Sequence, residues 1–579
     1  MAVDSPPRLE GDGDMQLGPC QQADVVRTRS LLPTVLFWLV AASLVFCSLG
    51  ARSLWGSEDR WAEIAREMRL TGDYFHPCIN GEPYFDKPLL GYWLICPAAA
   101  VLGRLDEAAA RLPSAVAALV ALAATMSLAR RLGSDRQARA AGWILLSMWG
   151  FLFWARTAEA DMENLAAIIL AVAWYWARRD KPGFLSYLVF YLICFIGAQT
   201  KGLGAIALPI LVVLPDVVRA NRWRSYLSAS HAAALLVGLS VYLAPLAYAE
   251  LTRADYHASG LYAAFKENVV RYFRPFDHKE PFYVYFMYVP ELVLPWVPLF
   301  LAALWRSILM FRRSDWPGRW LTLSILLVFL FFTVSGSRRS YYILPILPFC
   351  AILVSRFFEM DRGEKWNRVA LHLQVALLAA IAAFEVLTPA FWPVVKRRIG
   401  FVVPTDFVYV TVLLGLAALL PLIVERVRPG LLAPVTATIS EFGPSILMSA
   451  VMVGGFFVLQ ERILERFRSI RSFSLDLKDR VAALPPENVA YYRQYSVRTL
   501  FYMGLPEPIR SLQDTNQAND FLIPNGEPKV IISRRRFEKD LVGAFPDGVV
   551  PEPILKERTY PWEENKDPYE AWIIPGKGR

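Results

Sequence analysis

The stretch WGSEDRWAEIAREM places three charged residues directly after the first long apolar segment of the chain. They are Glu58, Asp59 and Arg60. Ser57 can cap the start of a helix there, and acids in the first turn would complement the positive end of the helix dipole. A carboxylate at a membrane surface can also act as a general base or bind a divalent cation. The stretch therefore predicts either a plain helix start or a working site.

Four more polar clusters lie at the ends of other apolar segments. WARTAEADMEN contains Asp161, QTKGLG contains Lys201, ENVVRYFRPFDHKEPFYVYF contains Arg271 and His278, and SGSRRSYYILPILP contains Tyr342. Arginine and lysine are suited to bind a phosphate or pyrophosphate group. Because ionisable side chains are costly at membrane depth, several such clusters on one face predict a cavity that binds an anion and holds carboxylates beside it.

Each cluster taken alone has a plainer explanation. Asp161 at a span boundary is more often a helix cap than a catalyst. Arg338 and Arg339 can anchor a helix at the membrane interface, and a lone His278 is more often packed in a loop than bound to a metal. The functional hypothesis therefore depends on the clusters sharing one face.

The composition excludes an ordinary soluble protein. Of 579 residues, 55% are hydrophobic, the mean hydropathy is +0.34, and apolar runs of about 15 to 20 residues recur between Ser30 and Leu459. The net charge of +9 comes from Lys and Arg in short loops, where they set topology, so it does not predict a nucleic-acid partner. The six cysteines are scattered and predict neither a disulfide nor a cysteine-bound metal.

The basic loops set the predicted topology. If these loops, between residues 130 and 430, all face the cytoplasm, spans must come in pairs between them. The segment 89–103 is short and contains Pro97, so we interpret it as an interfacial or re-entrant helix. About 13 transmembrane helices remain, with the N-terminus inside and the C-terminus outside. They are expected near 31–50, 112–129, 141–155, 162–177, 184–199, 203–218, 230–248, 285–311, 320–334, 342–358, 369–388, 407–424 and 441–459.

This topology divides the chain into three parts. Residues 1–28 are expected to be a disordered cytoplasmic segment. Residues 29–459 form an all-α transmembrane domain whose first outer loop, 51–111, carries interfacial helices, and the amphipathic segment 58–69 can lie flat on the membrane. Residues 460–579 contain the β-rich pieces ENVAYYRQY and PKVIISRRRF and predict a small extracytoplasmic α/β domain.

With all polar clusters on the outer side, the motif series resembles a known family. SEDRWAEIAREM, GDYFHP, NGEPYFDKPLLGYWL, ARLPSA and the clusters quoted above are similar to the protein O-mannosyltransferase and aminoarabinose lipid A transferase-like branch of the C-type membrane glycosyltransferases. The resemblance implies the C-type fold, a bacterial inner membrane and a periplasmic C-terminal domain. It also implies sugar transfer from a polyprenyl-phosphate donor to lipid A, another envelope glycan or a protein.

The resemblance further implies roles for particular residues. Ser57 stands where the family usually has its leading acid, so the catalytic carboxylate is expected at Glu58, Asp59 or Asp161. Contacts to the donor phosphate are expected from Arg60, Tyr84, Lys87, Arg271 and Tyr342. Asp86 and His278 resemble a pair that binds a divalent cation, the one cofactor the resemblance suggests.

Direct attack of an acceptor hydroxyl on the anomeric carbon would invert its configuration. Two other functions compete with this hypothesis. A flippase or transporter for lipid-linked sugars would also have many spans and buried charges, but its polar groups should lie near the midplane, with inverted repeats and paired broken helices. Inspection of the sequence reveals neither inverted repeats nor paired broken helices. A polymerase or ligase of surface polysaccharide would use the same lipid-linked donor.

Overall fold

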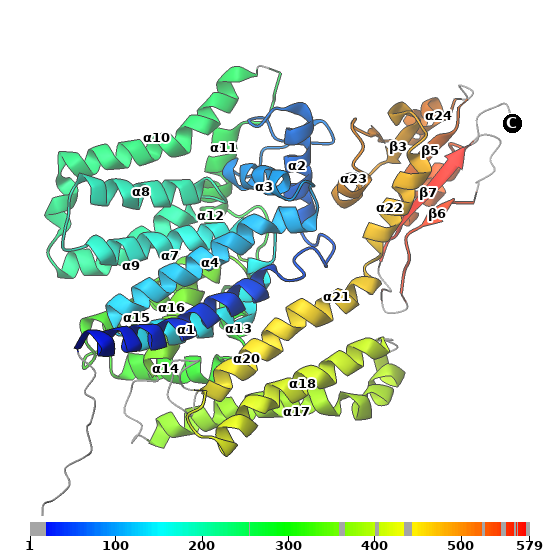
Figure 1. The fold of residues 1–579 in the computed structure, drawn as a ribbon. Helices are drawn as coiled ribbons and strands as arrows, with labels where there is room; N and C mark the ends of the chain where they lie inside the picture. Colours follow the sequence, from blue (N-terminus) through cyan, green and yellow to red (C-terminus); the bar gives the residue numbers. More distant parts are fainter. Residues whose placement is uncertain are drawn as a thin grey trace, which may run out of the picture.

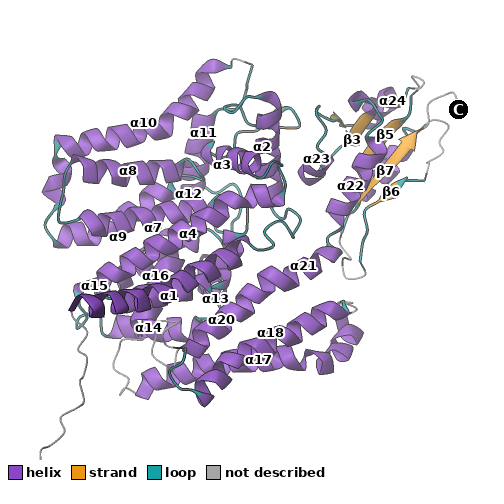
Figure 2. Cartoon of the chain, in the orientation of Figure 1, coloured by secondary structure: helices purple, strands orange, loops and turns teal. Residues whose placement is uncertain are grey.

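The computed structural model describes residues 19–253, 255–357, 365–399, 404–432, 443–523, 527–545, 552–560, 563 and 566–574. Figures 1 and 2 show a large bundle of helices beside a smaller region that contains a sheet. The sequence predicts that residues 1–28 are disordered. Residues 1–18 of this segment lie outside the described residues. Its remainder is helical instead, because α1 (Pro19–Phe46) begins in a run rich in Gln, Ala and Arg, which favour helix.

The rest of the bundle consists of helices joined mostly by short loops. Their bounds are α2 (Glu58–Thr71), α3 (Leu90–Val101), α4 (Glu107–Leu132), α5 (Asp135–Leu146), α6 (Trp149–Ala155), α7 (Asp161–Arg178), α8 (Phe184–Ala198), α9 (Gly204–Arg219), α10 (Ala229–Thr252), α11 (Gly260–Phe265), α12 (Arg271–Phe273), α13 (Tyr285–Val293), α14 (Val297–Leu309), α15 (Trp316–Val334), α16 (Leu347–Phe357), α17 (Lys365–Ile399) and α18 (Thr405–Val427).

A further series of helices leads from the bundle to the sheet region, as Figure 1 shows. It comprises α20 (Gly443–Gly455), α21 (Glu461–Leu464) and α22 (Ser469–Val481), followed by α23 (Val497–Met503), α24 (Thr515–Leu522) and α25 (Glu538–Val542). The five strands there are β3 (Val489–Tyr492), β4 (Arg510–Leu512), β5 (Lys529–Arg534), β6 (Leu555–Lys556) and β7 (Tyr569–Ile574).

The sheet has the order β4-β3-β5-β7-β6. β3 is parallel to both β4 and β5, with Ala490 opposite Arg510 and Ile531, whereas β7 is antiparallel to β5 and β6. Strands β3 and β5 lie within the two β-rich segments that the sequence singles out. Strands β3 and β5 are buried along most of their length, as expected where helices cover a sheet.

The described helices include several that can cross a membrane. By length and composition six qualify, or seven if the bent pair α5 and α6 counts as one span, and six shorter apolar helices accompany them. The protein is therefore a multi-pass, mainly helical membrane protein.

Two of the predicted spans are broken helices, which corrects the expectation that no paired broken helices occur. α5 and α6 are bent by 69°, and α13 and α14 are separated at Leu294 and Pro295. The breaks meet: the backbone N–H of Trp149 donates to the Leu294 carbonyl at 2.8 Å, and Trp296 Nε1 donates to Ser147 Oγ at 3.0 Å. These linking side chains carry no charge, so the contact does not resemble the ion site of a transporter.

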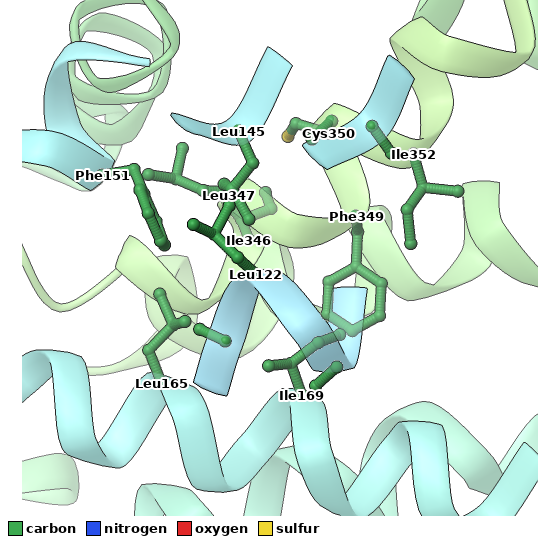
Figure 3. Packing of buried hydrophobic residues seen from close by; sticks show 14 of the residues in the cluster. Leu122, Leu145, Phe151, Leu165, Ile169, Ile346, Leu347, Phe349, Cys350 and Ile352 are labelled. Atoms are coloured by element: carbon green, nitrogen blue, oxygen red, sulfur yellow. The ribbon is translucent and has the colours of Figure 1, made fainter. Parts of the chain in front are cut away.

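The largest apolar core lies inside the bundle and holds the loops at its ends in place. Figure 3 shows Leu122 of α4, Leu145 of α5, Leu165 of α7 and Phe349 of α16 within one cluster. All four side chains are almost completely buried. Because this core packs the helices against one another, the polar residues at the helix ends are held at defined positions.

Helix α2 does not expose its apolar face to a membrane, contrary to the prediction. Trp61, Ile64 and Met68 are buried in a cluster that includes Leu477 and Leu500 of the sheet region. The amphipathic pattern is real, but another part of the same chain covers the apolar stripe. Helix α2 is thereby held between the bundle and the C-terminal region.

Candidate active site

The site begins at Glu58, the first residue of α2, which is fully buried. Its Oε1 and Oε2 accept hydrogen bonds from Arg111 Nε and Nη2, both at 2.7 Å. The backbone N–H groups of Trp55 and Ala158 donate to the same carboxylate at 2.8 and 2.9 Å, and Arg52 Nη2 lies 3.3 Å from Oε2. Glu58 thus connects α2, α4 and the 156–160 loop, and its oxygens are occupied.

Asp59 points in a different direction. Its Oδ2 lies 3.6 Å from Arg498 Nη2 on α23. Burial raises the pKa of Asp59, with Arg498 opposing the rise. Asp59 therefore contacts the C-terminal region.

The loop before α7 brings the third predicted carboxylate to the site. Ala160 adopts a left-handed conformation, φ 57°, directly before Asp161. Asp161 Oδ2 forms an ion pair with Lys201 Nζ, which also lies 4.7 Å from the ring centroid of Tyr341. Asn164 of α7 donates to the carbonyls of Gly197 and Gly202, at 3.2 Å each, and so fixes the turn that carries Lys201.

Asp161 lines a cavity of about 440 Å³, which we call the basic cavity. Its charged and hydroxyl-bearing lining includes Lys87, Asp161, Lys201, Arg271 and Tyr342. Apolar residues such as Leu208, Phe331 and Leu344 complete its walls. A cavity lined by both cations and apolar side chains can hold an anion attached to a hydrocarbon chain.

A continuous series of ion pairs, here called the charge ladder, holds these cations. Asp86 Oδ2 lies 3.4 Å from both Arg60 Nη1 and Lys87 Nζ. Glu267 Oε2 lies 3.1 Å from Lys87 Nζ and 2.6 Å from Arg271 Nη1. Such shared carboxylates keep long basic side chains in fixed positions, so less side-chain entropy is lost when an anion binds.

The ladder continues from Arg271 to a second cavity. Arg271 Nη2 lies 2.6 Å from Asp277 Oδ2, and His278 Nε2 lies 3.3 Å from the same oxygen and 3.1 Å from Arg339 Nη2. Burial and the neighbouring Arg339 lower the pKa of His278. One network of charges therefore runs from the basic cavity to the second cavity, which His278 and Arg339 line.

The second cavity has a volume of about 730 Å³ and lies on the other side of Tyr341, which lines both. We call it the aromatic cavity, because Trp55, Trp149, Phe153 and Trp154 are in its wall. Ser57, Arg60, Glu159, His278 and Arg339 add polar groups.

Glu159 occupies the space beside Ser57. Its Oε1 accepts a hydrogen bond from the Ser57 backbone N–H at 3.1 Å. Gly56 permits this approach: its φ is 61°, and a Cβ there would lie 3.1 Å from the same oxygen. The Glu159 carboxylate therefore lies next to Ser57, the position at which the family resemblance would lead one to expect an acid.

The predicted metal pair is not favoured by this geometry. Asp86 is surrounded by Arg60, Lys87 and Tyr92, whose hydroxyl donates to Oδ1 at 3.1 Å. His278 lies between Asp277 and Arg339. Within the described part of the chain, no three His, Cys, Asp or Glu side chains gather as a possible metal site. Cations around each donor do not fit a divalent ion, so no step is assigned to one.

The predicted residues divide into three groups. Lys87, Asp161, Arg271 and Tyr342 line the basic cavity, and Arg60 and His278 line the aromatic cavity. Tyr84 accepts a hydrogen bond from Arg60 at 2.6 Å and, like Asp86, supports a lining residue. Glu58 and Asp59 are engaged elsewhere.

Four important residues were not among the predicted ones. Arg111 and Glu267 are partners of predicted residues and lie in quoted motifs, but the pairing of Arg111 with Glu58 follows only from three-dimensional contacts. Glu159 and Lys201 lie in the quoted clusters, so their location at the ends of spans was the available signal. Glu267 also precedes Arg271 by one helical turn, a spacing that favours an ion pair.

Comparisons with known proteins show what the chain is similar to. Residues 86–248 match the family described as dolichyl-phosphate-mannose-protein mannosyltransferase. The structure superposes on the crystal structure of ArnT from Cupriavidus metallidurans bound to undecaprenyl phosphate with a TM-score of 0.72, at 22% identity, over 93% of this chain and 97% of that one. The apo form gives a TM-score of 0.67. The fold is therefore that of these two ArnT structures.

Sequence relatives agree with the fold. The chain is 32% identical over 375 residues to an undecaprenyl phosphate-alpha-4-amino-4-deoxy-L-arabinose arabinosyl transferase of Pseudomonas paraeruginosa, covering 62% of this chain and 65% of that one. A second such transferase, of Sodalis glossinidius, is 31% identical over 62% of this chain and 66% of its own length. The matches thus span slightly less than two thirds of these relatives. These transferases are what the chain is similar to over that length.

Proposed function

We propose that this protein is a membrane glycosyltransferase that moves a sugar from a polyprenyl-phosphate carrier to an acceptor hydroxyl. One observation carries the proposal: three cations and two carboxylates line one cavity whose remaining walls are largely apolar, namely Lys87, Lys201 and Arg271 with Asp161 and Glu267. A lipid phosphate needs such cations, and a polyprenyl chain needs such walls. The named donors of the arabinosyl transferase relatives are of this chemical class.

The reaction would be a single displacement. The acceptor hydroxyl oxygen attacks the anomeric carbon, the bond from that carbon to the phosphate oxygen breaks, and the electron pair stays on the phosphate. Lys87 and Arg271 would stabilise the developing negative charge. The configuration at the anomeric carbon inverts, because the nucleophile enters opposite the leaving group.

The proton of the acceptor hydroxyl requires a base. Glu58 is poorly suited because both of its oxygens are held by Arg111. Glu159 faces the aromatic cavity beside Ser57, and we assign it the role of base, with the acceptor entering from that side. Asp161 would then position Lys201 toward the leaving phosphate.

The proposed arrangement in the membrane follows the sequence. We place about 13 spans in a bacterial inner membrane, with the N-terminus cytoplasmic. In this proposal, residues 460–579 form an α/β domain on the periplasmic side, where they pack against α2. The acceptor would be a glycolipid such as lipid A, another envelope glycan or a protein.

The proposal can be tested with the purified full-length chain in proteoliposomes. The first donor to supply is undecaprenyl phosphate-linked 4-amino-4-deoxy-L-arabinose, followed by other undecaprenyl-phosphate sugars, with envelope glycolipid as acceptor. Mass spectrometry should detect free undecaprenyl phosphate together with a glycolipid heavier by one sugar. Intact donor appearing in the opposite leaflet without any cleavage would instead identify a flippase.

A further inference from the structure

A third cavity lies at the end of α7 opposite to Asp161. Helix α7 has 18 residues, so its two ends are about 27 Å apart at the usual rise of 1.5 Å per residue. That distance is close to the hydrocarbon thickness of a bilayer, about 30 Å. The two ends of α7 therefore lie near opposite membrane surfaces.

The walls of this third cavity are mainly aromatic. They include Trp174, Tyr187, Phe190, Tyr191 and Tyr226, and the volume is about 220 Å³. Tyr191 and His231 Nε2 are hydrogen-bonded at 2.7 Å, which fixes two of the rings. Pockets for whole small molecules usually exceed about 300 Å³. The cavity is therefore large enough for part of a flexible apolar chain but small for a complete metabolite.

The cavity opens toward the hydrocarbon. Leu214 of α9 lines it and exposes 49% of its surface, and Ile210, one turn earlier, also lines it and is 40% exposed. On a membrane helix such exposed leucine and isoleucine side chains face acyl chains. An acyl chain can consequently enter beside α9.

The rim of the cavity is positively charged. The two loop segments at this end, residues 178–181 and 216–224, together contain six Lys or Arg and two Asp. Asp216 is bound by Arg179 at 3.2 Å and Asp180 by Arg222 at 2.5 Å.

Arg178 remains on the rim without an ion pair to any described carboxylate. It stacks on Trp174, with Cζ 5.2 Å from the ring centroid, and is exposed. The positive-inside rule explains cationic loops in general. It does not explain a free guanidinium at the mouth of an aromatic cavity.

We propose that this cavity binds an anionic phospholipid of the surrounding bilayer. A segment of one acyl chain lies between the aromatic walls, and the phosphate contacts Arg178 and the nearby Lys181. Basic pockets between membrane helices are a known means of recognising anionic headgroups. The site lies in the leaflet opposite to the basic cavity, so it is separate from the site proposed for sugar transfer.

The test compares lipids that differ only in the headgroup. The full-length protein in detergent is mixed with phosphatidylglycerol or with phosphatidylcholine of identical acyl chains, and native mass spectrometry measures the bound fraction. We expect at least threefold more bound phosphatidylglycerol. Arg178→Gln should lower that fraction at least threefold, whereas the matched control Arg312→Gln, an exposed arginine outside the cavity lining, should not.

Two further arms separate the two parts of the ligand. Leu214→Trp should fill the mouth of the cavity and reduce lipid binding although Arg178 is present. Glycerol 3-phosphate in excess should not displace the lipid, because it lacks the acyl chain. Equal binding of the two lipids, equal effects of the two arginine variants, or full displacement by glycerol 3-phosphate would each overturn the proposal.

Discussion

Glu58 and Arg111 form a buried, two-point ion pair, in which Nε and Nη2 each lie 2.7 Å from a different carboxylate oxygen. Arg111 also donates to the carbonyls of Leu49, Arg52 and Ser53 at 2.7 to 3.0 Å. The pair and these hydrogen bonds therefore hold the segment between α1 and α2 against α4. Trp55, Ser57 and Arg60, which line the aromatic cavity, lie directly beside Glu58 in the chain.

Replacing one partner of this pair should destabilise the protein. Glu58→Gln leaves Arg111 buried without a counter-charge, and losing one partner of a buried pair typically costs about 3–5 kcal/mol. We expect a clearly lower midpoint of thermal unfolding in detergent. The control Glu82→Gln alters an exposed carboxylate and should not change the midpoint. If the two variants unfolded alike while only Glu58→Gln lost turnover, Glu58 would be a catalytic group after all.

The same pair predicts a dependence of stability on pH. Burial alone would raise the pKa of Glu58, but Arg111 and Arg52 together with the hydrogen bonds lower it from 4.5 to about 2. The folded state thus binds the proton more weakly than the unfolded chain. The contribution of Glu58 to stability is complete above pH 4.5 and is lost as the pH falls toward 2. Unfolding midpoints measured across this range should fall less steeply for Glu58→Gln than for the wild type.

The sequence predicted the residues of the basic cavity better than their neighbours. Asp161 and Arg271 lie in polar clusters at the ends of apolar runs, where ionisable groups are rare, and the family resemblance adds Lys87. The partner of Glu58 is Arg111, which is 53 residues away, so no local pattern could reveal that this carboxylate is occupied.

Tertiary packing also decided two features that periodicity could not. The stripe of Trp61 and Met68 predicts an amphipathic helix, but the pattern does not say whether lipid or protein covers it. The helix breaks at Ser147 within a continuous apolar run. Trp296, which is distant in sequence, donates a hydrogen bond to the Ser147 hydroxyl, and no local pattern indicates this contact.

The assignment of the base predicts different kinetics for two neighbouring acids. Glu159→Gln should lower kcat by about 100-fold or more while the KM for the donor changes little, since general base catalysis contributes 10²–10⁴-fold. Asp161→Asn should mainly raise the donor KM, because it releases Lys201. Glu163→Gln is the matched control, since that side chain is hydrogen-bonded to Ser114 instead. A kcat defect confined to Asp161→Asn would transfer the role of base to Asp161.

The charge ladder predicts a specific role for Arg271. Arg271→Gln should raise the donor KM about tenfold or more, as expected for the loss of a charged hydrogen bond worth about 1.5–3 kcal/mol. Arg274→Gln, three residues further on, changes an exposed arginine and serves as the control. Initial rates at varied donor concentration distinguish the two variants. An identical small effect of both would mean that Arg271 does not contact the phosphate.

Contact between the segment that joins α1 to α4 and the C-terminal region predicts a local change in hydrogen exchange. Asn80 and Gly81 form the turn between β1 (Cys78–Ile79) and β2 (Glu82–Pro83), with φ of 56° and 76°, as in a type I′ hairpin. Asn80 Nδ2 donates to the Ile509 carbonyl and its Oδ1 accepts from the Ile509 N–H, both at 2.7 Å. One side chain thus replaces a strand partner for Ile509, immediately before β4.

Asn80→Gly keeps the turn, because glycine adopts positive φ without strain, and removes only the two hydrogen bonds. At about 1 kcal/mol each, their loss should increase opening at Ile509 roughly 30-fold. Hydrogen–deuterium exchange of the peptide that contains Ile509 measures this change. Asn516→Ala, at an exposed position of α24, should leave the exchange of that peptide as it is. Unchanged exchange in both variants would show that the contact does not hold the C-terminal region against α2.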